Sequence, residues 1–234
     1  MESPKSDSRE VQIIETEDGS HSLYVPSLNE TYHSFHGAIR ESRHVFIKQG
    51  LEHWLFQNEK NRASILEIGF GTGLNALLAI EIALLKKVNI FYHTLEPYPL
   101  EDKVVKLLNY PALMQNESLQ EYFSLLHTSA WNEPIALDPF FTIQKQLSKL
   151  EEFNTEAHKF DVVFFDAFAP NKQAELWTYE MLEKVYNLMA PNGILVTYCA
   201  KGQLKRDLKS IGFEVETLPG PPGKKEMVRG GKKL

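Results

Sequence analysis

The sequence feature that most constrains the fold is a short apolar run followed by three glycines at alternate positions. The run Ser64–Ile68 has the composition of a buried parallel strand, and a helical pattern begins at Leu74. The glycines between them are Gly69, Gly71 and Gly73. Glycine lets the backbone turn sharply and lets a ligand approach, while a helix N-terminus offers unpaired N–H groups and partial positive charge. The segment therefore predicts a strand, a ligand-binding glycine turn and a helix start; a purely structural turn is the alternative.

The glycine spacing and a nearby carboxylate separate two classes of ligand. The dinucleotide fingerprint is G-x-G-x-x-G, with the pyrophosphate on the helix N-terminus. Here the spacing is G-x-G-x-G, and Glu67 stands two residues before the first glycine. A carboxylate repels a pyrophosphate but attracts the ammonium of a methionine moiety, so the pattern resembles motif I of Rossmann-like S-adenosylmethionine (SAM) methyltransferases. We predict that Glu67 and the turn bind SAM. The turn residues are Gly69, Phe70, Gly71, Thr72 and Gly73.

Length and composition indicate one soluble domain. The chain has 234 residues, of which 43% are hydrophobic and 24% charged, so it can bury a substantial core. No apolar run is long enough for a membrane span, and the N-terminus has no signal-peptide pattern, so we expect a cytoplasmic protein without a membrane partner. Cys199 is the single cysteine, which excludes an internal disulfide and a cysteine-based zinc site. We place Cys199 in the core.

Charge is unevenly distributed along the chain. The net charge is −6, but from Pro219 onward five basic residues and one acid give +4, which leaves −10 for the rest. The five basic residues are Lys224, Lys225, Arg229, Lys232 and Lys233. A basic edge on an acidic body favours phosphate contacts, and a solvated tail is the alternative.

Residues 1–62 are predicted to form an extension of a core at 63–234. Val11–Val25 has the pattern of a β-hairpin with a turn at Asp18-Gly19. The next segment, Tyr32–Ile47, is dense in hydrogen-bond donors: His33, His36, Arg40, Arg43 and His44. It lacks an H-x-x-x-H pair with a third ligand, so we predict a polar lid over the cofactor edge and no metal.

Strands and helices alternate through the core, which predicts an α/β fold with a mostly parallel seven-stranded sheet, an antiparallel last strand and helices on both faces. The predicted strands are Ser64–Ile68, Asn89–Leu95, Phe140–Ile143, Phe160–Phe165, Gly193–Cys199, Phe213–Leu218 and Glu226–Arg229. The predicted helices are His44–Asn58, Leu74–Leu85, Gln173–Met189 and Lys201–Ile211, with an irregular helical stretch over 100–131.

Two further carboxylates follow predicted strands. Glu96 comes one strand–helix–strand unit after Glu67, where a carboxylate accepts hydrogen bonds from both hydroxyls of a ribose. Asp166 follows the fourth strand, and ligands of open α/β sheets bind at the carboxyl ends of the strands, so Asp166 projects into the same crevice. Gln144–Leu147, after the third strand, contains no acid, so no adenine-binding side chain is predicted.

Several segments together resemble a known family. They are Tyr32–Ser34, Glu41–Phe46, Leu66–Asn75, Glu96–Leu100, Asp166–Pro170, Trp177-Thr178 and Lys225–Met227. From about Ile13 to Gly230 the chain resembles the methyltransferase half of the bifunctional tRNA wobble-uridine enzymes called MnmC, and their stand-alone counterparts called MnmD. Two departures are Ala167, where the family often has Gly, and the absence of an acid after the third strand.

The resemblance implies methylation of the exocyclic amine of 5-aminomethyl(-2-thio)uridine in the tRNA anticodon, with SAM as methyl donor. It implies Asp166 as the catalytic residue and adds Tyr32, Ser34 and Pro97 to the SAM site. Substrate contacts are expected from Phe168, Trp177, Lys224, Lys225 and Arg40. The implied partners are the tRNA anticodon arm and a separate flavin-dependent enzyme that supplies the aminomethyl group, with no flavin in this chain.

Asp166 has a chemical conflict to resolve. Methyl transfer needs the amine lone pair in line with the S–CH₃ bond, and an alkylamine is largely protonated near neutral pH. Asp166 can accept an N–H hydrogen bond and orient the lone pair, but a carboxylate also stabilises the ammonium form. Three other functions remain open: a small-molecule N-methyltransferase, a nicotinamide-dependent oxidoreductase, which the glycine spacing disfavours, and a non-catalytic RNA-binding module.

Overall fold

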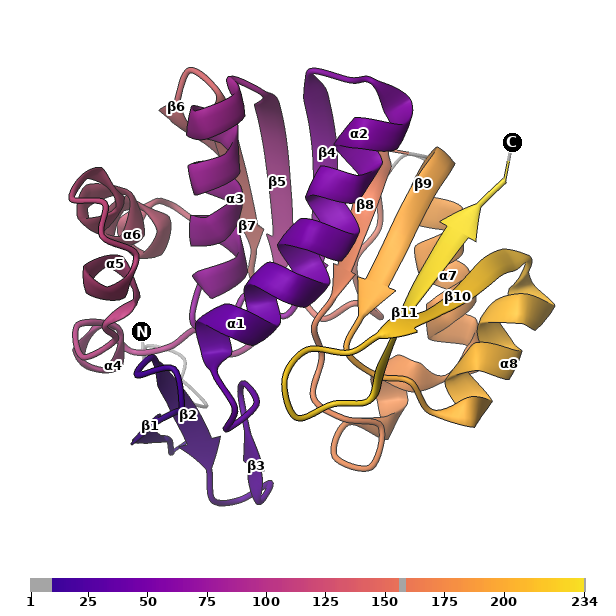
Figure 1. Ribbon diagram of the computed structural model, residues 1–234, viewed down its shortest axis with the longest axis horizontal. Helices are drawn as coiled ribbons and strands as arrows, with labels where there is room; N and C mark the ends of the chain where they lie inside the picture. Colours follow the sequence, from indigo (N-terminus) through magenta and orange to yellow (C-terminus); the bar gives the residue numbers. More distant parts are fainter. Residues whose placement is uncertain (1–9, 156–158, 234) are drawn as a thin grey trace, which may run out of the picture.

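The computed structural model describes residues 10–155 and 159–233, which form a large mixed sheet covered by helices and a small N-terminal sheet (Figure 1). The strand order of the large sheet is β10-β11-β9-β8-β4-β5-β7-β6. Its strands are β4 (Arg62–Ile68), β5 (Asn89–Leu95), β6 (Pro134–Asp138), β7 (Phe141–Gln146), β8 (Phe160–Phe165), β9 (Met189–Thr197), β10 (Phe213–Pro219) and β11 (Glu226–Lys232). Strands β7, β5, β4, β8 and β9 are parallel, so their carboxyl ends meet at one edge.

The large sheet has eight strands in the described part of the chain, not seven, and it is antiparallel at both edges. β11 pairs antiparallel with β9 and β10, as expected for the last strand. The additional strand is β6, which pairs antiparallel with β7 and begins at Pro134. Proline is tolerated as the first residue of an edge strand because no neighbour needs its N–H. The predicted mostly parallel α/β fold is otherwise confirmed.

Helices cover both faces of the large sheet, as predicted. The helices are α1 (Ala38–Ser42), η1 (Arg43–Glu52), α2 (His53–Asn58), α3 (Leu74–Lys86), α4 (Asp102–Val105), α5 (Tyr110–Leu113), α6 (Ser118–Thr128), η2 (Ala174–Trp177), α7 (Tyr179–Leu188) and α8 (Gly202–Ile211). Helix α3 and the continuous α1–η1–α2 helix cross one face, while α7 and α8 cover the other at the β9–β10 end (Figure 1). Alternate residues of β4 serve the two cores: Ile65 belongs to the first and Leu66 to the second.

The N-terminal residues form a three-stranded sheet of β1 (Gln12–Glu15), β2 (His21–Val25) and β3 (Glu30–Thr31). The predicted hairpin is therefore present, with one short additional strand. The predicted lid over Tyr32–Ile47 differs, because the chain is helical from Ala38 onward. Gly50 of η1 lies against the sheet, where an added Cβ would approach the Val196 and Phe164 side chains to 3.0 and 3.2 Å. The proposed boundary between residues 1–62 and 63–234 stays a prediction.

One smaller difference and one agreement concern the second half of the chain. The predicted helix Gln173–Met189 is interrupted at Thr178, which has an extended backbone and caps α7: its side-chain Oγ1 accepts a hydrogen bond from Met181 N. Cys199 is buried among the residues of the second core, as predicted.

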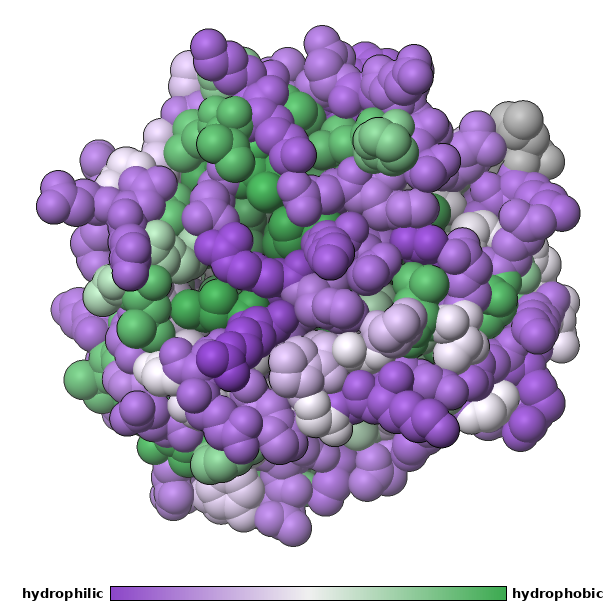
Figure 2. All heavy atoms as spheres, viewed as in Figure 1, coloured by the Kyte–Doolittle hydropathy of each residue, from purple (hydrophilic) through white to green (hydrophobic). Residues whose placement is uncertain are grey.

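The surface seen in Figure 2 is mostly hydrophilic, with an apolar area near the ends of α2 and α3. These helices carry Phe56 and Leu85, two of the most exposed large apolar side chains in the described residues. No described helix combines the length and the apolar composition needed to cross a bilayer.

Candidate active site

A hollow of about 1080 Å³, open to solvent, lies at the carboxyl ends of the parallel strands. It is lined by the glycine turn after β4, the loops after β5, β7 and β8, and residues of the N-terminal extension. Nine predicted site residues line it: Tyr32, Gly69, Phe70, Gly71, Thr72, Glu96, Pro97, Asp166 and Phe168. Convergence of these residues from separate loops makes it the candidate active site.

The glycine turn needs glycine for both conformation and space. Gly69, Gly71 and Gly73 have φ angles of 95°, 51° and 72°, in the region that favours glycine. An added Cβ at Gly71 would come within 3.1 Å of the Tyr32 ring, and one at Gly69 within 3.0 Å of the Asp166 carbonyl oxygen. Side chains here would occupy the narrow space between the turn, Tyr32 and the end of β8. The turn therefore presents backbone to the pocket.

Glu96 is fixed in place by backbone donors. Its Oε2 accepts a hydrogen bond from Gly71 N at 3.0 Å, and its Oε1 accepts one from Tyr98 N at 2.8 Å. The side chain is buried yet lines the pocket, directly after β5. Each carboxylate oxygen can accept more than one hydrogen bond. The geometry thus holds a preoriented pair of acceptor oxygens beside the glycine turn.

Glu67 lies beneath the pocket floor and does not line the pocket. It is fully buried and accepts hydrogen bonds from Thr94 Oγ1 at 2.8 Å and Asn75 Nδ2 at 3.1 Å. Burial raises the pKa of the Glu67 carboxyl to about 8; the hydrogen bond from Thr94 opposes this rise and the charge of Asp166 adds to it. Glu67 is therefore not the exposed carboxylate that we expected to attract an ammonium group.

Asn75, in the first turn of α3, stands between Glu67 and the pocket. Its Nδ2 donates to Glu67 Oε1 and, at 2.8 Å, to Asp166 Oδ2. Its Oδ1 is buried and has no hydrogen-bond partner within the described residues. Asn75 lines the pocket, so this oxygen is an acceptor that a ligand donor can satisfy. Sequence reasoning missed this role, although Asn75 lies within the segment that carries the family resemblance.

Asp166 is a half-buried carboxylate that follows β8, whereas Glu96 follows β5. Because β4 lies between these two strands, Asp166 and Glu96 lie at opposite ends of the pocket. Burial raises the pKa of the Asp166 carboxyl to about 7, and the charge of Glu41 adds to the rise, while Asn75 and Lys224 oppose it. Such a group exchanges protons in the neutral range, as expected of a general base.

Two aromatic side chains lie beside Asp166. The Tyr32 and Phe168 rings meet edge to face, with centroids 5.2 Å apart, and both line the pocket. Trp177 does not line it, contrary to our prediction. Its ring packs against Phe165 with centroids 4.8 Å apart, and its Nε1 donates to the Phe168 carbonyl at 2.8 Å. Trp177 thus supports the backbone of Phe168 from behind the wall.

The remaining predicted site residues lie outside the lining. Gly73 forms the helix start, and Ser34 donates its backbone N–H to Glu41 Oε2 at 2.7 Å. Arg40 and Lys225 are exposed. Lys224, predicted to contact phosphate, is instead held by Glu41 and the Tyr198 ring.

Most of the basic residues near the C-terminus have intramolecular partners. Arg229 pairs with Glu216, and Lys233 pairs with Glu214. Lys232 donates to two backbone carbonyls. The continuous phosphate-binding edge that the charge pattern favoured is therefore largely occupied by contacts within the protein.

A buried lysine supports the glycine turn from the side away from the pocket. Lys145 in β7 is fully buried, and its Nζ donates to the His127 carbonyl at 2.9 Å and lies 4.7 Å from the centroid of the Trp131 ring. His127 Nε2 in turn lies 3.1 Å from the Thr72 carbonyl oxygen. Burial lowers the pKa of Lys145 to about 8. The signal for this lysine was present in the sequence, because strand alternation places Lys145 on the same face as the apolar Phe141 and Ile143.

The residues present fit SAM. The Glu96 carboxylate matches a vicinal diol, and the unpartnered Asn75 Oδ1 matches an amino group. The loop after β7 contributes Ser148, Leu150 and neighbouring residues to the lining, which sequence reasoning did not assign. No group of three or more His, Cys, Asp or Glu side chains able to hold a metal ion occurs in residues 10–155 and 159–233.

The comparisons with known proteins agree with this geometry. A model of S-adenosyl-L-methionine-dependent methyltransferases matches residues 116–233, half of the chain. The chain belongs to this family. The crystal structure of MnmC2 from Aquifex aeolicus is similar to this methyltransferase with a TM-score of 0.78 and 25% sequence identity, over 97% of this chain and 72% of that one. Spermidine synthase from Thermotoga maritima, with a TM-score of 0.60 and 14% identity over 100% of this chain and 72% of that one, shares the fold.

Curated relatives match most of this methyltransferase. It is 30% identical over 212 residues to the tRNA 5-methylaminomethyl-2-thiouridine biosynthesis bifunctional protein MnmC of Pseudomonas fluorescens, covering 86% of this chain and 32% of the relative. The protein of the same name from Leptospira interrogans is 28% identical over 211 residues, with the same coverage of 86% and 32%. The chain thus spans about a third of the length of these curated relatives. The predicted resemblance is confirmed.

Proposed function

We propose that this methyltransferase transfers the methyl group of SAM to the exocyclic amine of 5-aminomethyl(-2-thio)uridine at the tRNA wobble position, in the cytoplasm. The observation that carries the proposal is the position of the Asp166 carboxyl group in the pocket, between an aromatic wall of Tyr32 and Phe168 and the glycine turn. The names of the curated relatives support the tRNA substrate, although the chain matches only about a third of their length.

SAM supplies a methyl group bound to a sulfonium sulfur. When a neutral amine attacks the methyl carbon, the S–CH₃ bond breaks and the sulfur leaves as a neutral thioether. In the proposed site the glycine turn gives the backbone surface, and the two oxygens of Glu96 accept the ribose hydroxyls. Asn75 Oδ1 accepts a hydrogen bond from the amino group of the methionine moiety, the role that we had assigned to Glu67. Leu150 provides an apolar contact for the adenine. Tyr32 closes the pocket across Gly71, where its ring lies near the turn.

Asp166 is proposed to hold and orient the substrate amine. When ionised, its carboxylate accepts an N–H hydrogen bond, which directs the lone pair along the line of attack. A pKa near 7 also lets Asp166 accept the proton that the alkylated amine loses, and pass it to solvent. Asn75 holds one carboxylate oxygen at 2.8 Å, so the other oxygen is left to face the amine.

The uridine ring is proposed to lie against Phe168 and Tyr32, because single-stranded RNA bases commonly stack on aromatic side chains. The exposed Arg40 and Lys225 are candidates for phosphate contacts. A separate flavin-dependent enzyme is the proposed partner that supplies the aminomethyl group of the substrate.

The proposal is tested by transfer of labelled methyl from SAM to tRNA isolated from a strain that lacks this gene. Nucleoside mass spectrometry should show conversion of 5-aminomethyl to 5-methylaminomethyl uridines, with or without the 2-thio group. Methylation of small amines alone would favour a small-molecule N-methyltransferase. Tight NADH binding without SAM binding would favour an oxidoreductase, and tRNA binding without methyl transfer would favour a non-catalytic RNA-binding module.

A further inference from the structure

Lys224 is held at the Asp166 end of the pocket by two groups from distant parts of the chain. Its Nζ lies 2.5 Å from Glu41 Oε1 and 3.7 Å from the centroid of the Tyr198 ring. Glu41 belongs to α1 and is almost fully buried, whereas Lys224 belongs to the loop between β10 and β11. The ammonium therefore occupies a cation site made of one carboxylate and one aromatic face.

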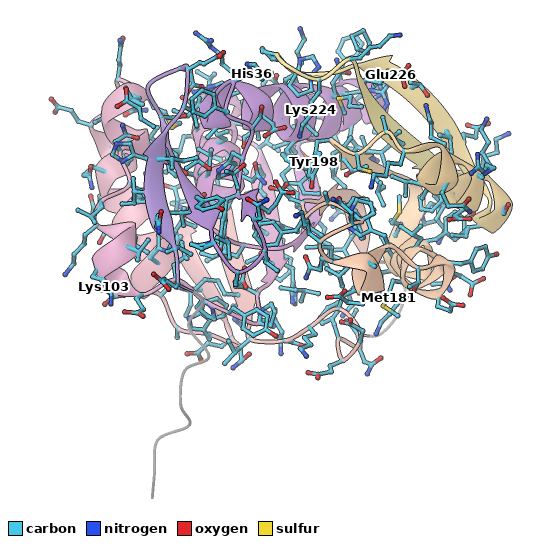
Figure 3. The ribbon with its side chains drawn as sticks, turned by 90° about the horizontal axis from the view of Figure 1, so that it is seen from below. His36, Lys103, Met181, Tyr198, Lys224 and Glu226 are labelled. Atoms are coloured by element: carbon cyan, nitrogen blue, oxygen red, sulfur yellow. The ribbon has the colours of Figure 1, made fainter. Side chains whose placement is uncertain are left out.

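This cation site is continuous with the pocket. Tyr198 lines the pocket, and its hydroxyl donates to the Ala167 carbonyl at 2.8 Å, one residue after Asp166. Seen from below, Lys224 lies between Tyr198 and His36 (Figure 3). His36 packs against the same loop, because an added Cβ at Gly223 would overlap its ring. The loop thus contacts the N-terminal extension at both Gly223 and Lys224.

The groups that act on Asp166 come from several elements. Glu41 and Lys224 affect its ionisation through their charges, and Asn75 affects it through a hydrogen bond. Asp166 in turn affects Glu67, Tyr92 and Tyr198, while Lys224 also acts on His33 and Cys199, the latter together with Lys201. Apart from Lys224, the charged group that acts on Asp166 is the Glu41 carboxylate. Without an internal cation, such a pocket would bind an alkylammonium ion tightly and keep it protonated, which removes the lone pair needed for methyl transfer.

We propose that Lys224 is a built-in counter-ion that fills the cation site of Glu41 and Tyr198, so that the substrate amine meets Asp166 in its neutral form. The inference rests on the proposed function and extends it to the selection of the protonation state. Lys224 is a positioning residue in this account, since it acts through Glu41 and Asp166. It resolves the conflict between the need to bind the amine and the need to keep it unprotonated.

The test compares Lys224→Met with Lys225→Met, because Lys225 is the exposed neighbour in the same loop. With Lys224→Met the charge of Glu41 is no longer neutralised. We expect kcat to fall at pH 7, the KM for tRNA to fall or stay constant, and the acid limb of the pH–rate profile to move up by about one pH unit. Lys225→Met should raise the KM for tRNA a few-fold, as a rim contact, but leave the acid limb at the wild-type pH, and Lys224→Arg should keep the acid limb near that of the wild type. SAM affinity, measured by calorimetry, should not change in any of them.

The double variant Glu41→Gln/Lys224→Met provides a rescue, because it removes the carboxylate together with its counter-ion. Its acid limb should return toward that of the wild type. If Lys224→Met alone does not fold, the comparison of Glu41→Gln with the double variant measures the same effect of Lys224. A Lys224→Met profile that matches Lys225→Met, or a double variant that is not rescued, overturns the inference.

A titration independent of activity separates this inference from the proposed function. In protein labelled with ¹³C at aspartate carboxyl groups, the NMR titration of Asp166 should move to higher pH in Lys224→Met and return in the double variant. A wild-type protein that methylates no tRNA would overturn the proposed function while this titration still decides the role of Lys224. An Asp166 titration that is unchanged by Lys224→Met overturns the inference, whatever the activity.

Discussion

The glycine-turn end of the pocket is assembled from short consecutive segments, whereas the Asp166 end gathers side chains from the whole length of the chain. At the first end, backbone N–H groups of Gly71 and Tyr98 hold Glu96. At the second, Glu41 of the N-terminal extension, Asp166 at the end of β8 and Lys224 near the C-terminus act on one another. The first end is thus held together by local backbone contacts, and the second by long-range tertiary contacts.

This difference predicts how each end responds to mutation. At the glycine-turn end the donors that hold Glu96 belong to the main chain, so a change there acts by removing the Glu96 acceptor or by adding a side chain to the turn. An end held by buried charges responds through ionisation, since each charge shifts the pKa of its neighbours. The predictions below test that division, in order of decreasing expected effect.

The largest effect is expected for Asp166→Asn. The variant keeps an acceptor oxygen for Asn75 but cannot take a proton, so kcat should fall by roughly 10²–10⁴-fold, the usual contribution of a general base. SAM affinity should stay within a few-fold of the wild type, because the side chain acts mainly in the transition state. Steady-state kinetics and calorimetry provide the two values. Equal losses in kcat and SAM affinity would assign Asp166 to cofactor binding and remove the contrast between the two ends.

The pH dependence of the wild type should carry the same signature. Because the pKa of Asp166 is raised to about 7, the carboxyl is protonated and inactive below that pH and becomes ionised as the pH rises through it. The value of kcat/KM should therefore rise with pH up to about 7 and then level off, until another group titrates. This rise should be absent in Asp166→Asn.

Glu96→Ala should weaken SAM binding by about 1–3 kcal/mol, which corresponds to roughly 5–150-fold in Kd, since it removes charged acceptors for two hydroxyls. The fold should persist, as monitored by circular dichroism. The matched control is Glu101→Ala, an exposed carboxylate in the same loop, and it should bind SAM normally. Unchanged SAM affinity in Glu96→Ala would rule out the binding of ribose by Glu96. The glycine-turn end would then contribute no side chain to SAM binding through Glu96.

The residues at the glycine-turn end of the pocket could largely be predicted from the sequence. The glycine turn, Glu96 and the order of strand ends follow from patterns within short windows, and the structure places them together. The Asp166 end was predicted only in part. Asp166 and Phe168 follow directly from the end of β8, but the functions of Glu41 and Tyr198 depend on packing between α1, β9 and the loop before β11. No periodicity or spacing encodes such contacts.

Two errors had the same physical origin. Trp177 was expected to contact the substrate, and only tertiary packing shows that it supports Phe168. Glu67 was placed against the ligand because a carboxylate attracts the ammonium of a methionine moiety. Strand alternation turns its side chain toward α3, where Thr94 and Asn75 take up its oxygens.

Trp177→Phe should show whether Trp177 supports the backbone of Phe168 or contacts the tRNA substrate. The change removes the hydrogen bond to the Phe168 carbonyl and some packing against Phe165, so the free energy of unfolding should fall by about 1–2 kcal/mol. The KM for tRNA should stay near that of the wild type, because Trp177 does not line the pocket. Denaturant unfolding and steady-state kinetics measure the two. A large rise in KM with unchanged stability would return Trp177 to the substrate surface.

The smallest effect is expected at the rim, for Lys225→Ala. Its exposed side chain forms no ion pair within the described residues, so it can contact a phosphate only as an isolated surface charge. The variant should lower the slope of log binding constant against log salt by about 0.7–0.9, the value for one released counterion, and raise the KM for tRNA only a few-fold. Glu226→Gln, one position further along the chain, is a control that should not lower this slope.

Because Lys224 is held by Glu41, adding Lys224→Met to Lys225→Ala should change the pH profile and not the salt slope. If the salt slope falls by a second unit in the double variant, Lys224 leaves Glu41 and Tyr198 to bind RNA. The division between the buried charges around Asp166 and the exposed basic residues that contact RNA would then be wrong.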